Sequence, residues 1–308
     1  MSVACREDIG FTLDFLRPVL EFGLLKPFLD YICWISEVLT SRGMPSQHVR
    51  DMLAWIGEFF EAELEPADFR LLNDALIKAA GGIGTDPAIS SRIDENMPEP
   101  WAETDELARM LLAGDARAVR ALFDSKLQAG LSLLQVEVHL LQPAMYQIGR
   151  EWQNNEVSVA QEHLATATAL TAMAQAHLHV EIPTVTDKKV LCACVATNQH
   201  VVGLQIVSDA FEANGWDVML LGADVPTPDL IRQIQLFAPS LVCLSVSMPE
   251  HLSIARDAIS RMREVLGDQV PGIMLGGLAI NGIGAVVETL GADFGASDAE
   301  GVLRDLPE

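Results

Sequence analysis

His200 lies between two different hydrophobic patterns, in a loop where an imidazole could bind a ligand or a metal ion. The valine-rich run Val190–Ala196 before it is typical of a buried parallel strand, and residues Leu204–Asn214 after it have helical spacing. In open α/β sheets, ligands bind at such strand-to-helix loops. The competing interpretation is that His200 only caps a helix in a cofactor-free α/β domain.

Two later loops also follow apolar runs and are built from small residues. Ser245 and Ser247 follow one run, and Gly276-Gly277 follows the next. Because the carboxyl ends of parallel strands converge, we expect these residues to lie near His200. Serine provides hydroxyl groups, and glycine lets a bulky ligand approach the backbone. The sequence therefore predicts a crevice that admits a long group beneath His200.

The order and spacing of these residues resemble the cobalamin-binding fold of methionine synthases, mutases and corrinoid proteins. The matching positions are His200, Gly203, Ser245, Gly276 and Gly277, with Ser247 as a small polar variant. The resemblance implies a doubly wound, flavodoxin-like α/β domain in which His200 is the lower axial ligand of cobalt. It also implies that the dimethylbenzimidazole tail of the cofactor threads past Gly203 toward Ser245 and the glycine pair.

Asn198 departs from this family pattern, in which an acidic residue usually contacts the ligand histidine. A carboxylate would fix the imidazole tautomer and raise its basicity, whereas an amide orients the ring without adding negative charge. We expect ligation by His200 to survive, with reduced strength.

A second group of residues lies upstream, around Trp152. Helical spacing brings one helix up to Trp152, and an Asn-Asn pair after it suits a turn. Ser158 with Gln161 has the form of a capping box, which predicts that the next helix starts there. Glu162 and His163 then fall in its opening turns, facing back toward the tryptophan.

This spacing of Trp152, Glu162 and His163 resembles the helical cap of light-responsive adenosylcobalamin photoreceptors, best known from MerR-type repressors. The resemblance implies that the three residues hold 5′-deoxyadenosine above the cobalt. The alternative places Trp152 in the core of a helical bundle and Glu162-His163 at a solvated helix start. Repressors of this family can carry a histidine after the tryptophan that captures cobalt after photolysis, but this chain has Gln153. The bis-histidine product is then absent, or another histidine such as His163 serves.

The composition limits the classes of partner. The chain of 308 residues has 43 acidic and 20 basic side chains, a formal net charge of −23, which opposes binding to nucleic acid. No apolar run reaches membrane-spanning length and the amino terminus lacks a signal-like pattern, so we expect a cytoplasmic protein without a membrane partner. Five cysteines at unrelated positions predict no disulfide framework.

The chain divides into four predicted regions. Residues 1–82 have the apolar spacing of an all-helical domain, and the glycine- and proline-containing stretch 83–102 is a linker. Residues 103–183 form the four-helix-bundle cap, and residues 184–308 form the flavodoxin-like cobalamin-binding domain.

The first region is rich in large side chains, including Trp34, Trp55 and Phe59, and contains His48. One interpretation is a helical packing or oligomerisation domain. The other is a second chromophore site, because the whole arrangement resembles the photocobilins, which bind a bilin next to adenosylcobalamin. That resemblance implies a linear tetrapyrrole such as biliverdin packed among these residues, with His48 near its polar groups.

Together these patterns favour a light sensor over an enzyme. The expected cofactors are adenosylcobalamin, with its cobalt, and a bilin, and the expected partner is a second copy of the chain in a light-dependent homo-oligomer. The downstream partner is not identifiable from the sequence. The competing hypothesis is a corrinoid methyl carrier that serves separate methyltransferases; a scaffold with a vestigial cofactor fold is disfavoured by the intact spacing.

Overall fold

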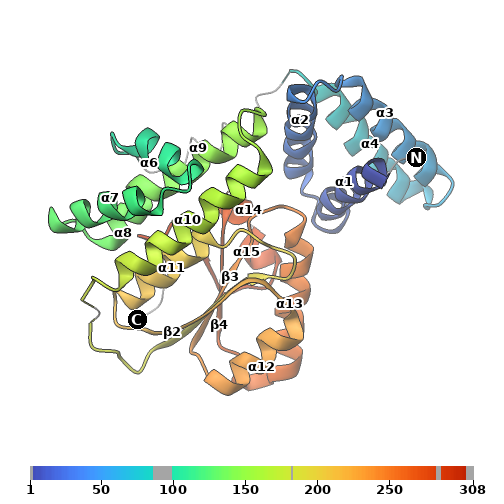
Figure 1. Ribbon diagram of the computed structural model, residues 1–308. Coiled ribbons are helices and arrows are strands. Elements are labelled where there is room, and N and C mark those ends of the chain that lie inside the picture. The colour runs from blue at the N-terminus through green and yellow to red at the C-terminus, as the bar shows by residue number, and fades with distance from the viewer. Residues whose placement is uncertain (1–2, 86–98, 182, 282–285, 303–308) are drawn as a thin grey trace. The chain divides into compact units, whose positions relative to one another are not determined.

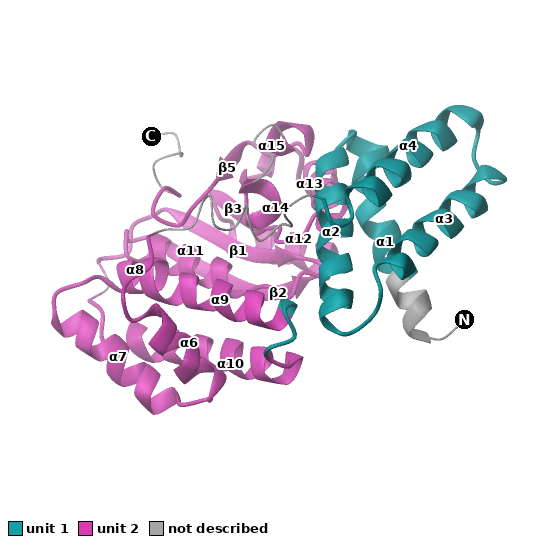
Figure 2. Cartoon of the chain, turned by 90° about the horizontal axis from the view of Figure 1, so that it is seen from above, with its two compact units in different colours: residues 1–96, 153–156 teal, residues 97–152, 157–308 magenta. Residues whose placement is uncertain are grey.

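The computed structural model describes residues 3–85, 99–181, 183–281 and 286–302. The chain forms two compact units, one made of residues 1–96 with 153–156 and the other of residues 97–152 with 157–308 (Figure 2). The second unit contains both the predicted cap and the predicted sheet domain.

The N-terminal unit is all helical, as the apolar spacing predicts. Its helices are α1 (Val3–Phe22), α2 (Leu25–Ser41), α3 (Gln47–Glu61) and α4 (Pro66–Gly82). Pro66 opens α4 at a position where its missing N–H costs nothing. The buried side chains include Leu16, Phe28, Ile32, Leu53 and Leu72. Most of the predicted linker, residues 86–98, lies outside the described residues.

The second unit begins with a bundle of helices. These are α6 (Thr104–Leu112), α7 (Ala116–Gln128), α8 (Leu133–Val136), the π-helical turn η1 (Glu137–Leu141), α9 (Gln142–Gln153) and α10 (Val159–His177). Helix α10 presents a buried row of small residues, Ala165, Ala169, Ala172 and Ala176, to the bundle core. Because alanine side chains are short, the neighbouring helices α6 and α7 can approach α10 closely (Figure 1).

The remainder of this unit is a five-stranded parallel sheet with helices on both faces. The strands are β1 (Lys189–Val195), β2 (Asp217–Val225), β3 (Leu241–Ser245), β4 (Gly272–Gly276) and β5 (Phe294–Ala296). The helices are α11 (Val202–Glu212), α12 (Thr227–Phe237), α13 (His251–Leu266), the short η2 (Gly267–Gln269), α14 (Leu278–Asn281) and α15 (Val286–Thr289).

The strand order is β2-β1-β3-β4-β5, with every neighbouring pair parallel. This is the doubly wound, flavodoxin-like order, so the predicted fold class is confirmed. The order reverses between β1 and β3, and ligands bind at such a switch point. The loops that carry His200 and Ser247 both start from this point.

The apolar runs read from the sequence are the buried strands. Strands β1 and β3 are covered on both faces, which explains their continuous rather than alternating hydrophobicity. Cys192, Cys194 and Cys243 are buried, unpaired thiols in one core cluster, as the absence of a disulfide pattern predicts. Among the helices of the described residues, none has both the length and the apolar character needed to cross a membrane.

Candidate functional site

The loop after β1 is held in an unusual backbone conformation by the end of β2. Thr197 has φ of +68° and Asp224 has φ of +49°, both in the left-handed region. The Thr197 N–H donates to Asp224 Oδ1 at 2.6 Å, and the Asp224 N–H donates to the Asn198 carbonyl at 3.0 Å. Such strain persists only where surrounding contacts enforce it, and it is common at ligand sites.

Asn198 is completely buried and connects the first loop to the second. Its Nδ2 donates to the Ser245 carbonyl oxygen at 2.9 Å and to Ser247 Oγ at 3.2 Å. Its Oδ1 accepts the backbone N–H of His200 at 3.1 Å. Since a carbonyl can only accept and a backbone N–H can only donate, these contacts fix the orientation of the amide.

This orientation determines the tautomer of His200. His200 Nδ1 lies 3.1 Å from Asn198 Oδ1, an oxygen that can only accept, so Nδ1 must carry the proton. Nε2 then keeps its lone pair, and within the described part of the chain no hydrogen bond to Nε2 is present. The predicted role of Asn198, orienting the ring as a neutral amide, is consistent with this geometry.

The imidazole of His200 is accessible to solvent but closely surrounded by protein atoms. Desolvation lowers its pKa, and the negative charge of Glu162 opposes that shift. The ring is therefore neutral at physiological pH, which is the form that ligates metals. Because the carboxylate of Glu162 on α10 acts on His200, the cap residue and the sheet-loop residue face the same region.

The two glycine positions differ in what they permit. A Cβ at Gly203 would meet no atom within 4 Å, so the space beside this turn of α11 is open. Gly277 has φ of +106°, and a Cβ there would lie 2.5 Å from the Val246 carbonyl oxygen. Gly277 is therefore required by the backbone, whereas Gly203 leaves open space beside it. A Cβ at Gly276 would be in ordinary contact with Ala296, 3.4 Å from its carbonyl oxygen.

The turn and the helix start predicted around the cap motif are present. The Ser158–Gln161 capping box starts α10, and Asn155, with φ of +62°, makes the turn after α9. Glu162 Oε2 lies 2.6 Å from His163 Nδ1, and Glu162 Oε1 accepts from Thr166 Oγ1 at 3.0 Å. The side chain of His163 is 74% exposed.

Trp152 is partly buried at the end of α9, where the turn connects it to α10. The Val157 N–H donates to the Glu151 carbonyl at 3.3 Å, which closes this turn. Glu162, in the helix after this turn, is close enough to His200 for its charge to affect the pKa of the imidazole. The contacts of Trp152 and His163 with a cofactor remain predictions.

His251 is a buried residue near the site that the sequence analysis did not select. It begins α13, which follows the Ser247 loop, and its Nδ1 is buried without a hydrogen-bond partner among the described residues. Desolvation, together with the nearby His200, lowers the pKa of His251 to about 4. The sequence signal that could have identified His251 is its position at the start of a helix, directly after the loop that carries Ser247.

The residues present fit a cobalamin. The lower ligand needs a neutral imidazole with a free Nε2, and Asn198 imposes that state on His200. Small residues also suit a bulky ligand, and the space beside Gly203 is open to a depth of at least one side-chain atom. Cobalt would bind at His200.

The aromatic residues of the N-terminal unit are divided between its core and its surface. Tyr31 is buried and stacks on Phe15 with ring centroids 3.6 Å apart. Trp55 is 56% exposed and Phe59 is 62% exposed. The predicted bilin contacts at Trp55 and Phe59 thus lie on an apolar surface of α3 and not in an enclosed slot of this unit.

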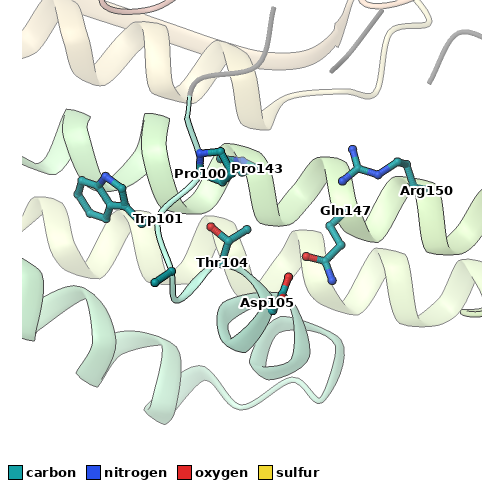
Figure 3. Close-up of a pocket in the computed structure, with 8 residues that line it drawn as sticks. Pro100, Trp101, Thr104, Asp105, Pro143, Gln147 and Arg150 are labelled. Carbon is teal, nitrogen blue, oxygen red and sulfur yellow. The ribbon is translucent and has the colours of Figure 1, made fainter. Parts of the chain in front are cut away.

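A separate pocket of about 300 Å³ lies in the bundle, between the start of α6 and helix α9 (Figure 3). Its lining residues are Pro100, Trp101, Ala102, Thr104, Asp105, Pro143, Gln147 and Arg150. None of them belongs to the sheet loops or to the Trp-Glu-His motif. This pocket is therefore distinct from the predicted cofactor site.

Comparison with known proteins supports cobalamin binding by the second unit. Residues 103–176 and residues 188–305 each match a family described as a B12 binding domain. The chain is 28% identical to the HTH-type transcriptional repressor CarH of Myxococcus xanthus over 209 residues, covering 67% of this chain and 69% of that one. It is 25% identical to the HTH-type transcriptional repressor CarA of the same organism over 229 residues, covering 69% and 73%.

The fold is also similar to a solved structure, the monomethylamine corrinoid protein of Methanosarcina barkeri. The TM-score is 0.55 at 20% identity, with 64% of this chain and 93% of that chain covered. This likeness supports the fold. Residues 103–176 and residues 188–305 are therefore two different kinds of B12 binding domain, one after the other in the sequence. The chain is a cobalamin-binding protein.

Proposed function

We propose that this protein is a light sensor that holds adenosylcobalamin between His200 and the cap residues Trp152, Glu162 and His163. The observation that carries the proposal is that the negative charge of Glu162, on the cap helix α10, acts on the pKa of His200, since this places the cap motif and the lower ligand on the same side of the unit. The resemblance of this motif to light-responsive adenosylcobalamin photoreceptors supports it. The two curated relatives are named as transcriptional repressors, which are regulators and not enzymes.

Each residue has a distinct task in this proposal. His200 binds the metal through Nε2, and Asn198 holds the ring in the required tautomer. Thr166 and His163 fix the carboxylate of Glu162, which can then accept hydrogen bonds from ribose hydroxyls. When bound, adenosylcobalamin supplies a cobalt–carbon bond that light cleaves.

The output of the sensor is a change in homo-oligomer assembly. Val159 is 54% exposed and Leu164 is 45% exposed on the first turns of α10, on either side of Glu162. Apolar side chains in this position can be buried by a second copy of the chain. Loss of contacts between the adenosyl group and the start of α10 would alter that surface, and light would thereby shift the assembly equilibrium.

Light scattering tests this function. The full chain, loaded with adenosylcobalamin in the dark, is measured before and after illumination, and its absorption spectrum is followed. We expect the spectrum and the mass to change together, while protein loaded with hydroxocobalamin keeps the same mass in dark and light. Complete photolysis with an unchanged mass would contradict the proposed output.

The corrinoid methyl carrier is the competing function, and the fold similarity to a corrinoid protein is compatible with it. A methyl carrier has less need for a lid over the upper face of the cofactor. It would bind methylcobalamin at least as tightly as adenosylcobalamin. Calorimetric titration with both cofactors separates the two functions.

A further inference from the structure

A second group of ligand-type side chains lies where the helical cap meets the sheet domain, within the second unit. His177 is the last residue of α10, and Asp209 and Glu212 are on α11. His177 Nε2 is 2.9 Å from Glu212 Oε2, and His177 Nδ1 is 3.9 Å from Asp209 Oδ1. One nitrogen and two carboxylate oxygens of this trio lie within 4.8 Å of one another. Figure 1 shows α10 and α11 side by side.

A fourth residue and third carboxylate, Glu137, is directed at this group from the bundle. Its side chain is completely buried and faces Asp209, whose Oδ2 is also buried. The two carboxyl groups can share a hydrogen bond only when one of them is protonated. Because two ionised carboxylates cannot hydrogen-bond to each other, this buried contact requires either a proton or a cation.

The helix geometry places Glu137 there. Glu137 is the first residue of the π-helical turn η1, which interrupts the run from α8 to α9. Single π-helical turns inside α-helices are costly and frequently accompany functional sites. On α11, Asp209 and Glu212 are three residues apart, which places both on one face of the helix.

The carboxyl groups of this cluster hold protons more tightly than usual. Burial raises the pKa of Glu137 well above its ordinary value, and the adjacent Asp209 raises it further. The pKa values of Asp209 and Glu212 are also raised, in each case mainly by burial. The favourable partners of these carboxyls are His177 and, for Asp209, the protonated carboxyl of Glu137 and the Gln205 amide at 2.8 Å. A bound cation would replace the proton that Glu137 and Asp209 otherwise share.

We infer that His177, Asp209 and Glu212, with Glu137, bind a divalent transition-metal ion of the Zn²⁺ type. Imidazole nitrogen together with carboxylate oxygen suits zinc, whereas calcium and magnesium favour sites made of oxygen ligands. With metal–ligand distances of about 2.0–2.2 Å, a tetrahedral zinc site has ligand atoms roughly 3.3–3.6 Å apart. The three candidate ligand atoms, one from each residue, lie within 4.8 Å of one another, so the side chains must move closer together to complete the site. The metal would bind one nitrogen of His177 and displace the carboxylate contact that this nitrogen now makes.

A metal bound at this site would link two helices of the second unit. It would join α10, which carries Glu162 and His163 at its other end, to α11, which begins two residues after His200. The metal would therefore fasten the cap to the sheet domain at a distance from the cobalamin ligands. This inference does not depend on light sensing.

Calorimetric titration of tag-free, chelator-treated, cofactor-free full chain with Zn²⁺ tests the site, with Mg²⁺ as the comparison ion. We expect one Zn²⁺ per chain and a higher Tm with Zn²⁺ only. The variant His177→Asn should lose about tenfold or more in Zn²⁺ affinity. The matched control is His179→Asn, because His179 is exposed two residues beyond α10 and should leave Zn²⁺ binding unchanged.

Glu137→Gln provides a variant that retains the side-chain volume while removing one carboxylate that could bind the metal. We expect the metal-free variant to keep a Tm close to that of the wild type, and the rise in Tm produced by Zn²⁺ to be smaller. If Zn²⁺ changes neither the Tm nor the heat of titration of the wild type, the four residues form a proton-sharing network and the metal site is refuted. Equal Zn²⁺ affinity of the wild type and His177→Asn would also overturn it.

Discussion

Asn198 Oδ1 lies 3.1 Å from His200 Nδ1, and the same amide donates to the Ser245 carbonyl through its Nδ2. A chain of contacts thus runs from β3, through a buried amide, to the imidazole on the loop after β1. Because the acceptor at Ser245 fixes the amide, the tautomer of His200 is imposed before any ligand binds.

The first prediction concerns His200 itself. His200→Ala removes the imidazole that Asn198 orients, so cobalamin affinity should fall and the bound cofactor should lose histidine ligation. Electron paramagnetic resonance of the cob(II)alamin form reports this as loss of the nitrogen coupling. His48→Asn, an exposed histidine of the N-terminal unit, is the control. A nitrogen coupling that persists in His200→Ala would show that another residue is the ligand.

Asn198→Ala should weaken cobalamin binding without removing the ligand. The residues that orient a metal-bound histidine typically contribute a factor of about 10–100 in affinity. Calorimetry with hydroxocobalamin measures the change, and Gln199→Ala is the neighbouring control because Gln199 is exposed. Equal affinity in Asn198→Ala and the wild type would mean that His200 does not require this amide.

Trp152→Ala should reduce the preference for adenosylcobalamin over methylcobalamin. In the proposed arrangement Trp152 contacts the adenosyl group and not a methyl group, so affinity for methylcobalamin should be retained. Titration of the wild type and the variant with both cofactors provides the comparison. Equal losses for the two cofactors would instead place Trp152 in the bundle core.

The two glycines should respond differently to alanine. Gly203→Ala introduces a Cβ into open space, so the Tm should be unchanged while cobalamin affinity falls. Gly277→Ala forces a side chain onto Val246 at a positive φ, which costs about 1–3 kcal/mol for the backbone conformation and more for the contact. Thermal unfolding and cofactor titration measure the two effects. A large loss of Tm in Gly203→Ala would contradict the open space beside Gly203.

The last prediction is that the N-terminal unit binds a linear tetrapyrrole such as biliverdin, packed among residues that include Trp34, Trp55 and Phe59. Co-expression with a haem oxygenase should give a red-absorbing band that co-purifies with the protein. The double variant Trp55→Ala, Phe59→Ala should lose this band while keeping its fold, since both side chains are exposed. If the wild type shows only corrin bands, the unit is a packing or oligomerisation module.

The local elements were predictable from the sequence because they depend on neighbouring residues. The Ser158–Gln161 capping box and the buried strand β1 each rest on periodicity or short-range hydrogen bonds. The spacing of His200, Ser245 and Gly277 indicated three converging loops, since parallel strands all end at one edge of the sheet.

The relationships between distant segments depended on the tertiary structure. Asn198 and Ser245 are 47 residues apart, and only packing of β1 against β3 brings the amide to that carbonyl. The approach of Glu162 to His200 likewise requires the cap to pack on the sheet domain. No short-range pattern encodes these contacts, because they arise from the burial of whole elements.

Three further features were not predictable from the sequence, because they depend on how the helices pack. The helical spacing around His177 predicts only an ordinary surface or core position. Its carboxylate neighbours come from two other helical segments, η1 and α11, so only packing brings them together. A π-helical turn has no clear signal in hydrophobic spacing, so the burial of Glu137 was not predicted. The exposure of Trp55 and Phe59 depends on which face of α3 the other helices cover. The sequence determined the elements and the lower loop, whereas tertiary packing decided which polar side chains meet.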